Sequence, residues 1–373
     1  MNELSDFSDF SHVELSLLQH ACSNGIPING SLELLPLCNM DCAMCYVRLD
    51  HKAMEQAGRL RTVDEWLKLA GQMRSAGVLF LLLTGGEPLL YPDFQTLYLE
   101  LKKMGMILTV NTNGTLIDQT WAQFFGQHKP RRVNVSVYGS SNETYQALCH
   151  YPDGYDRTIR AIHLLRENGV DVKINCSVTR INKRDIDQIL DICASLCVPI
   201  HIDSYMYPAT RERTMDYPMQ SRLAPEEAAE IWHKSLKAEM DESQYRLYRE
   251  HLLKQINQRR QAAADETTGT MAMECMAGSC SFTVSWQGFM RPCVMLEAPS
   301  LPVFSSSFGE CWNRLKQETA QISLCPYCAA CAYRPLCHVC AASAFHESGS
   351  YRGKSEYLCK LAAECCRQLA GGS

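Results

Sequence analysis

The first candidate for chemistry is a group of three cysteines near the N-terminus. Cys38, Cys42 and Cys45 form a C-x3-C-x2-C spacing directly after the apolar segment 31–37. Thiolate sulfurs are soft ligands that suit iron–sulfur clusters or zinc. Three thiolates on one short loop can bind three irons of a cubane and leave the fourth iron open, as a catalytic metal requires. A zinc knuckle and a chance grouping of cysteines remain as alternatives.

The second candidate is a glycine-rich turn after the next apolar segment, residues 78–84. It reads Thr84-Gly85-Gly86-Glu87-Pro88. Glycines allow a backbone to approach a ligand closely, and α/β folds bind ligands just beyond the carboxyl ends of their strands. Taken by itself, this segment is better explained by an ordinary turn.

The third candidate is a cysteine-rich unit at the C-terminus. The chain contains 20 cysteines, and 12 of them lie in residues 275–373. In a long chain without a secretion signal, such cysteines point to metal rather than to disulfides. Two C-x2-C pairs at Cys328–Cys331 and Cys337–Cys340 suggest a zinc ribbon. However, ribbon pairs are normally about 15–20 residues apart, and here only five residues separate them.

The elements that must position these residues alternate between strand and helix. Apolar runs predict strands at 31–37, 78–84, 106–111, 132–137, 171–179 and 198–204, and amphipathic patterns predict helices at 63–77, 93–104, 115–127, 154–168 and 183–196. Such apolar runs are typical of parallel strands buried on both faces. We therefore predict an α/β fold, a partial TIM-like (β/α)6 barrel with a small cysteine-rich C-terminal domain. The predicted units are a cap at 1–30, the barrel at 31–205, a helical bridge and linker at 206–271, with its helical part at 225–262, and the C-terminal domain at 272–373.

Composition excludes several classes of protein. The 373 residues carry a net charge of −5, so no general basic field would attract a nucleic acid. No apolar run approaches the roughly 20 residues of a membrane span. The first 30 residues lack the pattern of a signal peptide. We expect a cytoplasmic protein without nucleic-acid or membrane partners.

Taken together, the motif Cys38-x3-Cys42-x2-Cys45 and the later GGEP turn resemble those of radical S-adenosylmethionine (SAM) enzymes. The resemblance implies a [4Fe–4S] cluster on these cysteines, with SAM bound to the open iron. Reductive cleavage of SAM would give a 5′-deoxyadenosyl radical that abstracts a substrate hydrogen. Gly85, Gly86 and Glu87 would hold the SAM amino group. The residues implied on the ribose side are Asn113 and Ser136.

The fourth predicted strand departs from the usual pattern of this family. Many relatives read Ser-x-Asp-Gly there and carry an arginine twelve residues after the serine. This chain reads Ser136-Val-Tyr138-Gly and has Leu148 at that position. Arg180, at the end of the fifth predicted strand, is our substitute candidate because a guanidinium can bind a carboxylate through two hydrogen bonds. A solvated arginine at a strand end is the competing interpretation.

The C-terminal unit resembles the SPASM extension of radical SAM enzymes, which carries auxiliary [4Fe–4S] clusters. Cys275-x12-Gly288-x4-Cys293 fits the first half of its pattern, although Cys340 follows Cys337 one residue early. By this resemblance two clusters form, one on Cys275, Cys280, Cys293 and Cys340, and the other on Cys328, Cys331, Cys337 and Cys359. Cys280 is the least secure of these ligands, and Cys325 could replace one of them.

The resemblance implies an enzyme that modifies a peptide or protein substrate, by a thioether, a carbon–carbon crosslink or side-chain oxidation. A reductant such as flavodoxin or ferredoxin is implied as partner. Many such enzymes carry a fused leader-binding domain before the cluster loop. Because 37 residues precede Cys38, a separate leader-peptide-binding protein is a possible partner. One alternative is a formylglycine-forming sulfatase maturase, disfavoured because Val294 stands where that subgroup has an aspartate base. The other is a non-catalytic iron–sulfur or zinc-binding protein.

Overall fold

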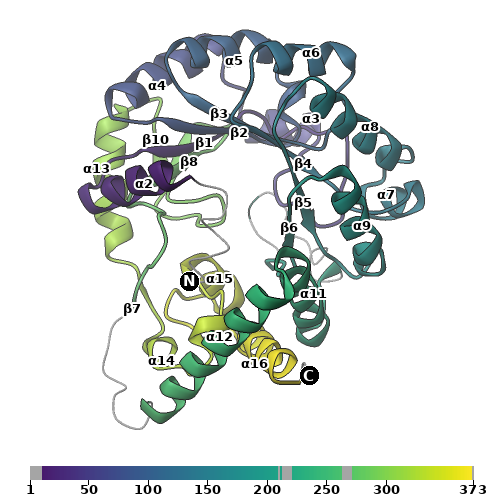
Figure 1. The fold of residues 1–373 in the computed structure, drawn as a ribbon. Helices are drawn as coiled ribbons and strands as arrows, with labels where there is room; N and C mark the ends of the chain where they lie inside the picture. The colour runs from purple at the N-terminus through teal and green to yellow at the C-terminus, as the bar shows by residue number, and fades with distance from the viewer. Residues whose placement is uncertain (1–10, 209–210, 212–220, 263–270, 372–373) are drawn as a thin grey trace.

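The core of the molecule is a curved sheet whose concave side faces the C-terminal helices (Figure 1). The computed structural model describes residues 11–208, 211, 221–262 and 271–371. The sheet has nine strands in the order β10-β9-β8-β1-β2-β3-β4-β5-β6. Its central strands are parallel and follow chain order: β1 (Asn29–Glu33), β2 (Phe80–Thr84), β3 (Ile107–Thr112), β4 (Arg132–Ser136), β5 (Val172–Ser177) and β6 (Ile200–Asp203). The predicted α/β partial barrel is confirmed, and among the described residues its end strands do not pair with each other.

The two faces of each central strand differ in polarity. In β4, Val133 and Val135 are fully buried against the outer helices, whereas Asn134 and Ser136 alternate with them and are half-buried. Because successive side chains of a strand point to opposite faces, these polar residues face the inside of the arc. There the Asn134 side chain donates a hydrogen bond to Asn111 Oδ1 on β3 at 2.8 Å. The concave face is thus a polar surface that can receive a ligand.

Helices connect the parallel strands and cover the convex face. They are α3 (His51–Ala57), α4 (Val63–Ser75), α5 (Phe94–Lys103), α6 (Gln119–Gln127), α7 (Asn142–Cys149), α8 (Gly154–Glu167) and α9 (Ile186–Leu196). The start of α4 shows the local logic: Thr62 accepts from the Glu65 backbone while Glu65 accepts from that of Thr62, a capping box. Its buried face presents Trp66 and Met73 to the core.

The C-terminal unit is joined to the barrel through the sheet. β8 (Ser281–Val284) pairs in parallel with β1, and β9 (Phe289–Arg291) and β10 (Leu301–Pro302) extend the sheet beyond it. A side-chain hydrogen bond of 2.8 Å links Ser31 to Thr283 across the β1–β8 pair. We predicted six strands followed by a separate small domain. The C-terminal strands instead satisfy the edge of β1, which would otherwise expose unpaired backbone groups.

The remaining helices lie before β1 or after β6 in the chain. α2 (His12–Asn24) precedes β1, and α13 (Phe308–Ala320) follows β10. The predicted helical region 225–262 consists of two helices, α11 (Pro225–Glu239) and α12 (Glu242–Ala262). The backbone is extended at Met240, which ends the first helix, and Asp241 accepts a hydrogen bond from the Gln244 backbone at the start of the second. α14 (Pro326–Ala329), α15 (Ala341–Ser348) and α16 (Glu356–Gly371) complete the C-terminal unit, with α16 packed on α11.

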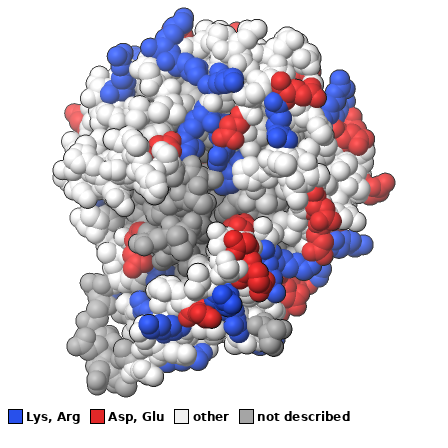
Figure 2. Space-filling model, viewed as in Figure 1, with Lys and Arg blue, Asp and Glu red and all other residues white. Residues whose placement is uncertain are grey.

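Two short strands, β7 (Met271–Ala272) and β11 (Ser323–Leu324), pair antiparallel beside α14 and α15. Most of the predicted loop 206–224 and of the predicted linker at 263–271 falls outside the described residues. Acidic and basic side chains are interspersed over the face shown in Figure 2, in keeping with the small net charge. Among the helices of the described part, none is long and apolar enough to cross a bilayer.

Candidate functional site

The three N-terminal cysteines lie on a loop at the carboxyl end of β1. Cys38, Cys42 and Cys45 are all half-buried. Backbone N–H groups point at two of the sulfurs, from Met40 to Cys38 at 3.4 Å and from Arg48 to Cys45 at 3.3 Å. Hydrogen bonds to sulfur are one way in which a protein tunes an iron–sulfur cluster. The loop therefore offers three partly accessible sulfurs with backbone donors already in place.

The end of α7 holds this loop in position. The Asp41 and Ala43 backbone N–H groups donate to the carbonyls of Cys149 and Leu148, at 3.0 and 2.8 Å. Leu148, which stands where many relatives have arginine, is fully buried. In the structure its carbonyl accepts the hydrogen bond from the Ala43 backbone and so supports the cysteine loop.

The GGEP turn packs against the segment that leads into the cluster loop. The Gly86 and Glu87 backbone N–H groups donate to the carbonyls of Leu35 and Leu37, at 2.7 and 2.9 Å. A Cβ on Gly85 would lie 2.5 Å from the Leu35 carbonyl oxygen. The glycines thus allow backbone to approach backbone here, and their predicted contact with SAM stays a prediction.

Glu87 is completely buried and organises the turn after β3. Its carboxylate accepts hydrogen bonds from Thr112 Oγ1 and the Asn113 backbone, both at 2.8 Å, and from the Leu89 backbone at 3.1 Å. Burial raises its pKa to about 7, against the lowering effect of these hydrogen bonds. With no exposed surface, its side chain fixes β2 to β3 beside the cysteine loop.

Asn113 brings β3 into contact with the cluster loop. Its amide nitrogen donates to Asn39 Oδ1 at 2.9 Å and reaches Cys38 Sγ at 3.6 Å. Its amide oxygen accepts from the Thr115 backbone at 2.9 Å. The side chain is therefore adjacent to the predicted cluster ligand Cys38. Its predicted contact with SAM ribose stays a prediction.

The other two predicted SAM contacts have different environments. Ser136 lies half-buried at the carboxyl end of β4, on the concave face. Arg180 is exposed, and its charge lowers the pKa of Glu227, behind the larger effects of Lys183 and local hydrogen bonds. Neither of the two cavities described below is lined by Arg180. Its position agrees with the competing interpretation of a solvated arginine.

The donor set of the N-terminal loop consists of three free thiols, which suit a cubane with one open iron. Among the described residues, no three His, Cys, Asp or Glu side chains converge on a point where one metal ion could sit. Zinc needs its ligands around a single ion. A cubane takes each thiolate on a different iron, so its ligands stand apart. Burial raises the pKa of Cys38, and the thiol would lose its proton on binding metal.

The C-terminal cysteines fall into two groups. Cys275 and Cys340 both influence the titration of Cys293, whose pKa burial raises to about 11, so these three sulfurs are neighbours. The second group consists of Cys328, Cys331, Cys337 and Cys359, with Cys325 beside it. Burial, together with the neighbouring Cys325 thiol, raises the pKa of Cys328 to about 12. Cys340 thus sits with the earlier cysteines despite following Cys337 closely. Ligand roles for both groups stay predictions.

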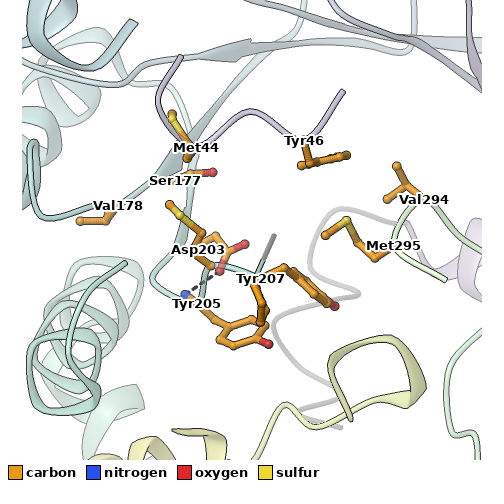
Figure 3. Close-up of a pocket in the computed structure, with 11 residues that line it drawn as sticks. Met44, Tyr46, Ser177, Val178, Asp203, Tyr205, Tyr207, Val294 and Met295 are labelled. Carbon is orange, nitrogen blue, oxygen red and sulfur yellow. Dashed lines mark hydrogen bonds between the residues drawn. The ribbon is translucent and has the colours of Figure 1, made fainter. Parts of the chain in front are cut away.

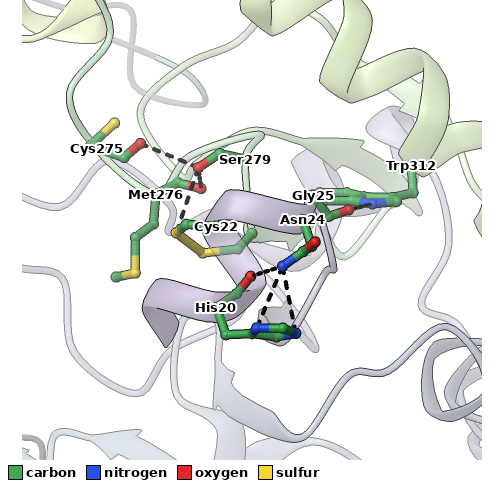
Figure 4. The surroundings of a disulfide bond; sticks show 9 residues. His20, Cys22, Asn24, Gly25, Cys275, Met276, Ser279 and Trp312 are labelled. Carbon is green, nitrogen blue, oxygen red and sulfur yellow. Dashed lines mark hydrogen bonds between the residues drawn. A yellow bond between two sulfur atoms is a disulfide. The ribbon is translucent and has the colours of Figure 1, made fainter. Parts of the chain in front are cut away.

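Cys280 is bonded to Cys22 in a disulfide that ties α2 to the start of β8 (Figure 4). Cys280 is fully buried. A sulfur in a disulfide is not available as a thiolate ligand, so Cys280 does not join Cys275 in the first group. The structure therefore disagrees with the prediction of Cys280 as a cluster ligand. Sequence reasoning missed this pair because its members are 258 residues apart.

Two adjoining cavities open beside the cluster loop. The first, here called the loop cavity, measures ≈ 260 Å³ and is lined mainly by Met44, Tyr46, Ser177, Val178, Asp203, Tyr205, Tyr207, Val294 and Met295. Figure 3 shows these side chains around it, drawn from the cluster loop, β5, β6 and the C-terminal unit. Asp203 accepts from the Tyr205 backbone at 2.9 Å. Asp203 is exposed at the cavity, and the protein around it raises the pKa of its carboxyl, although the Tyr205 backbone, His201 and His338 oppose the shift.

The second cavity, here called the strand cavity, measures ≈ 290 Å³ and lies against the concave face of the first strands. Its lining includes Asn29, Ser31, Glu33, Tyr46, Thr84, Asn111, Thr283, Cys293 and Val294. Tyr46 and Val294 line both cavities, so the two adjoin. Among the described residues that line either cavity there is no lysine or arginine. The only carboxylates in these linings are Asp203 and Glu33.

Sequence reasoning missed Glu33, Tyr46 and Asp203. Each lies at the carboxyl end of a strand or in the loop that follows one, where α/β folds place functional groups. Glu33 also carried a signal, because a carboxylate inside an apolar strand segment requires a buried partner. That partner, Arg211, lies far away in the sequence and no local pattern indicates it.

Residues 32–193, which include the cysteine loop and the GGEP turn, match the radical SAM superfamily. The chain therefore contains a radical SAM domain over these residues, and the protein is an enzyme.

Relatives over most of the chain are named AdoMet-dependent heme synthase. The one from Nitratidesulfovibrio vulgaris is 26% identical over 88% of this chain and 90% of its own length. The one from Methanosarcina barkeri is 25% identical over 87% and 94%. The subtilosin biosynthesis protein AlbA of Bacillus subtilis is 25% identical over 43% of this chain and 35% of its own.

Solved structures confirm the fold. Streptococcus suis SuiB bound to S-adenosylmethionine superposes with a TM-score of 0.62 at 15% identity, over 92% of this chain and 78% of that chain. The structure of anSMEcpe with bound AdoMet gives 0.65 at 18% identity, over 92% and 97%. The partial-barrel architecture thus extends to proteins of very different sequence.

Proposed function

We propose that this enzyme cleaves SAM reductively and abstracts a hydrogen atom from a peptide or protein side chain. The product would be a thioether, a carbon–carbon crosslink or an oxidised side chain. Three thiols on one loop, Cys38, Cys42 and Cys45, would hold the catalytic [4Fe–4S] cluster. A bound cluster and SAM would supply the one-electron chemistry that starts the reaction.

One observation carries this proposal: the two predicted cluster regions open onto the same pair of cavities. Met44 and Tyr46 flank Cys45 and line the loop cavity. Cys293, from the C-terminal group, lines the adjoining strand cavity. A substrate in the strand cavity would therefore lie between the catalytic loop and the C-terminal cysteines. Such a site suits radical chemistry, because the walls exclude water from a reactive species.

The loop cavity suits the nucleoside part of SAM. Met44 and Val178 offer apolar walls for a base, and the hydroxyl of Ser177 and the carboxylate of Asp203 can accept hydrogen bonds from ribose hydroxyls. An acidic residue in this role is familiar from dinucleotide-binding folds. In this proposal Glu87 and Asn113 act by holding the cluster loop, and Ser136 borders the same side of the barrel.

The strand cavity suits a neutral or cationic peptide group. Its polar lining of Asn29, Ser31, Thr84 and Asn111 can hydrogen-bond a peptide backbone. The subtilosin biosynthesis protein supports a peptide substrate by its name, and SuiB has been seen bound to a precursor peptide. We propose that the C-terminal groups carry auxiliary clusters as a SPASM extension does, one on Cys275, Cys293 and Cys340 and one on Cys328, Cys331, Cys337 and Cys359. A flavodoxin- or ferredoxin-type reductant would supply electrons.

A tetrapyrrole substrate is the second candidate, because the relatives that match most of this chain are named heme synthases. Such a substrate carries carboxylates, which proteins normally bind with arginine or lysine. The described linings of both cavities lack these residues. A formylglycine-forming reaction remains a weaker alternative, because Val294 beside Cys293 cannot accept a proton.

The first experiment is anaerobic reconstitution with iron and sulfide, followed by an iron count and a dithionite-driven assay for 5′-deoxyadenosine. We expect about twelve irons per chain, as three cubanes require, together with SAM cleavage. Cys38→Ala should abolish cleavage and lower the count by about four irons. Cys197→Ser is the matched control, since Cys197 is an exposed free thiol at the end of α9. Full iron without cleavage would contradict the proposal.

The two substrate classes are separated by a binding titration. Iron coproporphyrin shifts its Soret absorbance when a protein pocket takes it up, whereas a peptide leaves that band unchanged. We expect no saturable shift at stoichiometric concentrations. A saturable shift with tight affinity would favour the tetrapyrrole candidate and overturn the peptide assignment.

A further inference from the structure

A buried ion pair borders the strand cavity through its carboxylate partner. Glu33, the last residue of β1, lines this cavity. Arg211 donates from Nη1 to Glu33 Oε1 at 2.6 Å and from Nη2 to Oε2 at 2.8 Å. The two side chains are only 1% and 2% exposed. This two-pronged contact is the geometry in which a carboxylate binds a guanidinium most specifically.

An aromatic ring adds to the same site. The guanidinium carbon of Arg211 lies 5.6 Å from the ring centroid of Tyr46. A cation at this distance from an aromatic face is attracted by the ring electrons. Tyr46 also lines both cavities. Carboxylate and ring together form a receptor for a planar cation, and this receptor borders the space assigned to the substrate.

The residue that fills the receptor is not in a relaxed backbone conformation. Arg211 has φ of 59°, in the left-handed region that side chains other than glycine rarely adopt. Its backbone N–H donates to Glu297 of the C-terminal unit at 3.2 Å. Placing the Arg211 guanidinium in this site therefore requires an unfavourable backbone conformation at Arg211. A guanidinium from another molecule would bind there without that free-energy cost.

We propose that Glu33 and Tyr46 bind a guanidinium group of the substrate, and that Arg211 occupies this site until the substrate arrives. This inference rests on the proposed function, because it names the substrate class of the same cavity: a peptide with an arginine near the modified residue. An exchange of one guanidinium for another keeps the buried carboxylate paired throughout. Leaving Glu33 without a cation would be strongly unfavourable.

A second buried ion pair shows what a purely structural pair looks like. Arg222 and Glu347 are 5% and 10% exposed, and the Arg222 guanidinium lies 3.4 Å from the ring centroid of Tyr357. Neither Arg222 nor Glu347 lines a described cavity. This pair joins the start of α11 to α15 and contacts Tyr205 of the loop cavity, whose hydroxyl donates to Glu347 at 2.8 Å, but neither partner lines the strand cavity. It therefore supplies a matched control.

The test measures binding of two tripeptides, acetyl-Gly-Arg-Gly-amide and its citrulline counterpart, by calorimetry on the anaerobic reconstituted chain. Citrulline has nearly the same shape as arginine but no charge. We expect the wild type to prefer the arginine peptide by about tenfold. Arg211→Ala should bind that peptide about tenfold more tightly than the wild type, and Glu33→Gln should lose the preference. Arg222→Ala also breaks a buried ion pair and lowers stability, but it should keep the wild-type preference for the arginine peptide.

Equal binding of both peptides by the wild type would overturn the inference, and this comparison needs no variant to fold. A gain in Arg211→Ala that is the same for both peptides would also overturn it, because an enlarged cavity alone would then explain the result. The proposed function is judged separately by SAM cleavage in the wild type. Loss of arginine selectivity with intact cleavage would sink only this inference.

Discussion

At the scale of single residues, Glu87 has a structural role that the sequence did not predict. The resemblance implies that Gly85, Gly86 and Glu87 hold the SAM amino group, and that contact stays a prediction. The structure encloses the Glu87 carboxylate completely, with three donors around it. Two of these donors come from Thr112 and Asn113, so a single side chain fixes the end of β3 beside the cysteine loop. Buried polar groups of this kind are costly to disturb, because each donor left without a partner destabilises the fold.

The titration of Glu87 gives the first prediction. Its pKa is raised from 4.5 to about 7, so the folded chain holds this proton more tightly than the unfolded chain does. The stability it contributes is complete below pH 4.5 and is lost as the pH rises to about 7. Over that range the wild type should lose up to about 3 kcal/mol relative to Glu87→Gln, which does not titrate. Anaerobic urea unfolding of both metal-free chains at several pH values measures the difference. Parallel pH profiles would show that Glu87 does not titrate as inferred.

The other site residues differ in whether the sequence close to them indicates their position in the site. Cys38, Cys42 and Cys45 could be identified as a group from spacing, because all three lie on one loop. Asn113 could be placed near them because it follows a strand at the same edge of the sheet. Glu33 and Arg211 could not be paired, since nothing near either residue indicates the other. Arg180 was chosen by its position at a strand end, and the structure leaves it in solvent.

At the scale of elements, the six parallel strands could be predicted to within a few residues. Their apolar runs alternate with amphipathic helices, and this alternation leaves few topologies open. The addition of β8 to β1 could not be predicted in the same way. The pairing joins residues about 250 positions apart, and the short apolar segment of β8 has no local feature that selects β1 as its neighbour.

The contact between the GGEP turn and the segment after β1 gives the second prediction. A Cβ on Gly86 would lie 2.6 Å from the Leu37 carbonyl carbon and 2.8 Å from the Pro36 carbonyl oxygen, and both are backbone atoms that cannot rotate away. Gly86→Ala should therefore displace the cysteine loop, lower its iron content and destabilise the chain by about 1–3 kcal/mol.

Gly71 is the matched control for that substitution. It lies within α4, and a Cβ there meets nothing within 4 Å. Gly71→Ala should stabilise the chain by up to about 1 kcal/mol, because alanine favours a helix, and should leave the iron content unchanged. Thermal unfolding and iron analysis of both variants make the comparison. Full iron in Gly86→Ala would show that the turn does not position the loop.

At the scale of the whole molecule, the N-terminal helix α2 and the C-terminal unit meet at the barrel. α2 comes from the N-terminus and β8 from the C-terminal unit, and the Cys22–Cys280 disulfide joins them. The Trp312 indole N–H on α13 also donates to the Gly25 carbonyl at 2.9 Å, just past α2. The cap, the barrel and the C-terminal unit are therefore linked through one edge of the sheet. A movement of the C-terminal cysteines relative to the loop of Cys38, Cys42 and Cys45 would have to distort the contacts along that edge.

The last prediction separates the two possible roles of Cys280. If Cys280 stabilises the fold through its bond to Cys22, then Cys22→Ala and Cys280→Ala should each lower the free energy of unfolding by about 2–4 kcal/mol. Both should keep the iron content of the reconstituted wild type, whereas Cys293→Ala should lose part of it. A reducing compartment would open this bond, so the wild type with excess thiol should become as unstable as the variants. If Cys280→Ala loses iron while Cys22→Ala keeps it, Cys280 is a cluster ligand after all, because only a ligand role makes the two partners of one disulfide unequal.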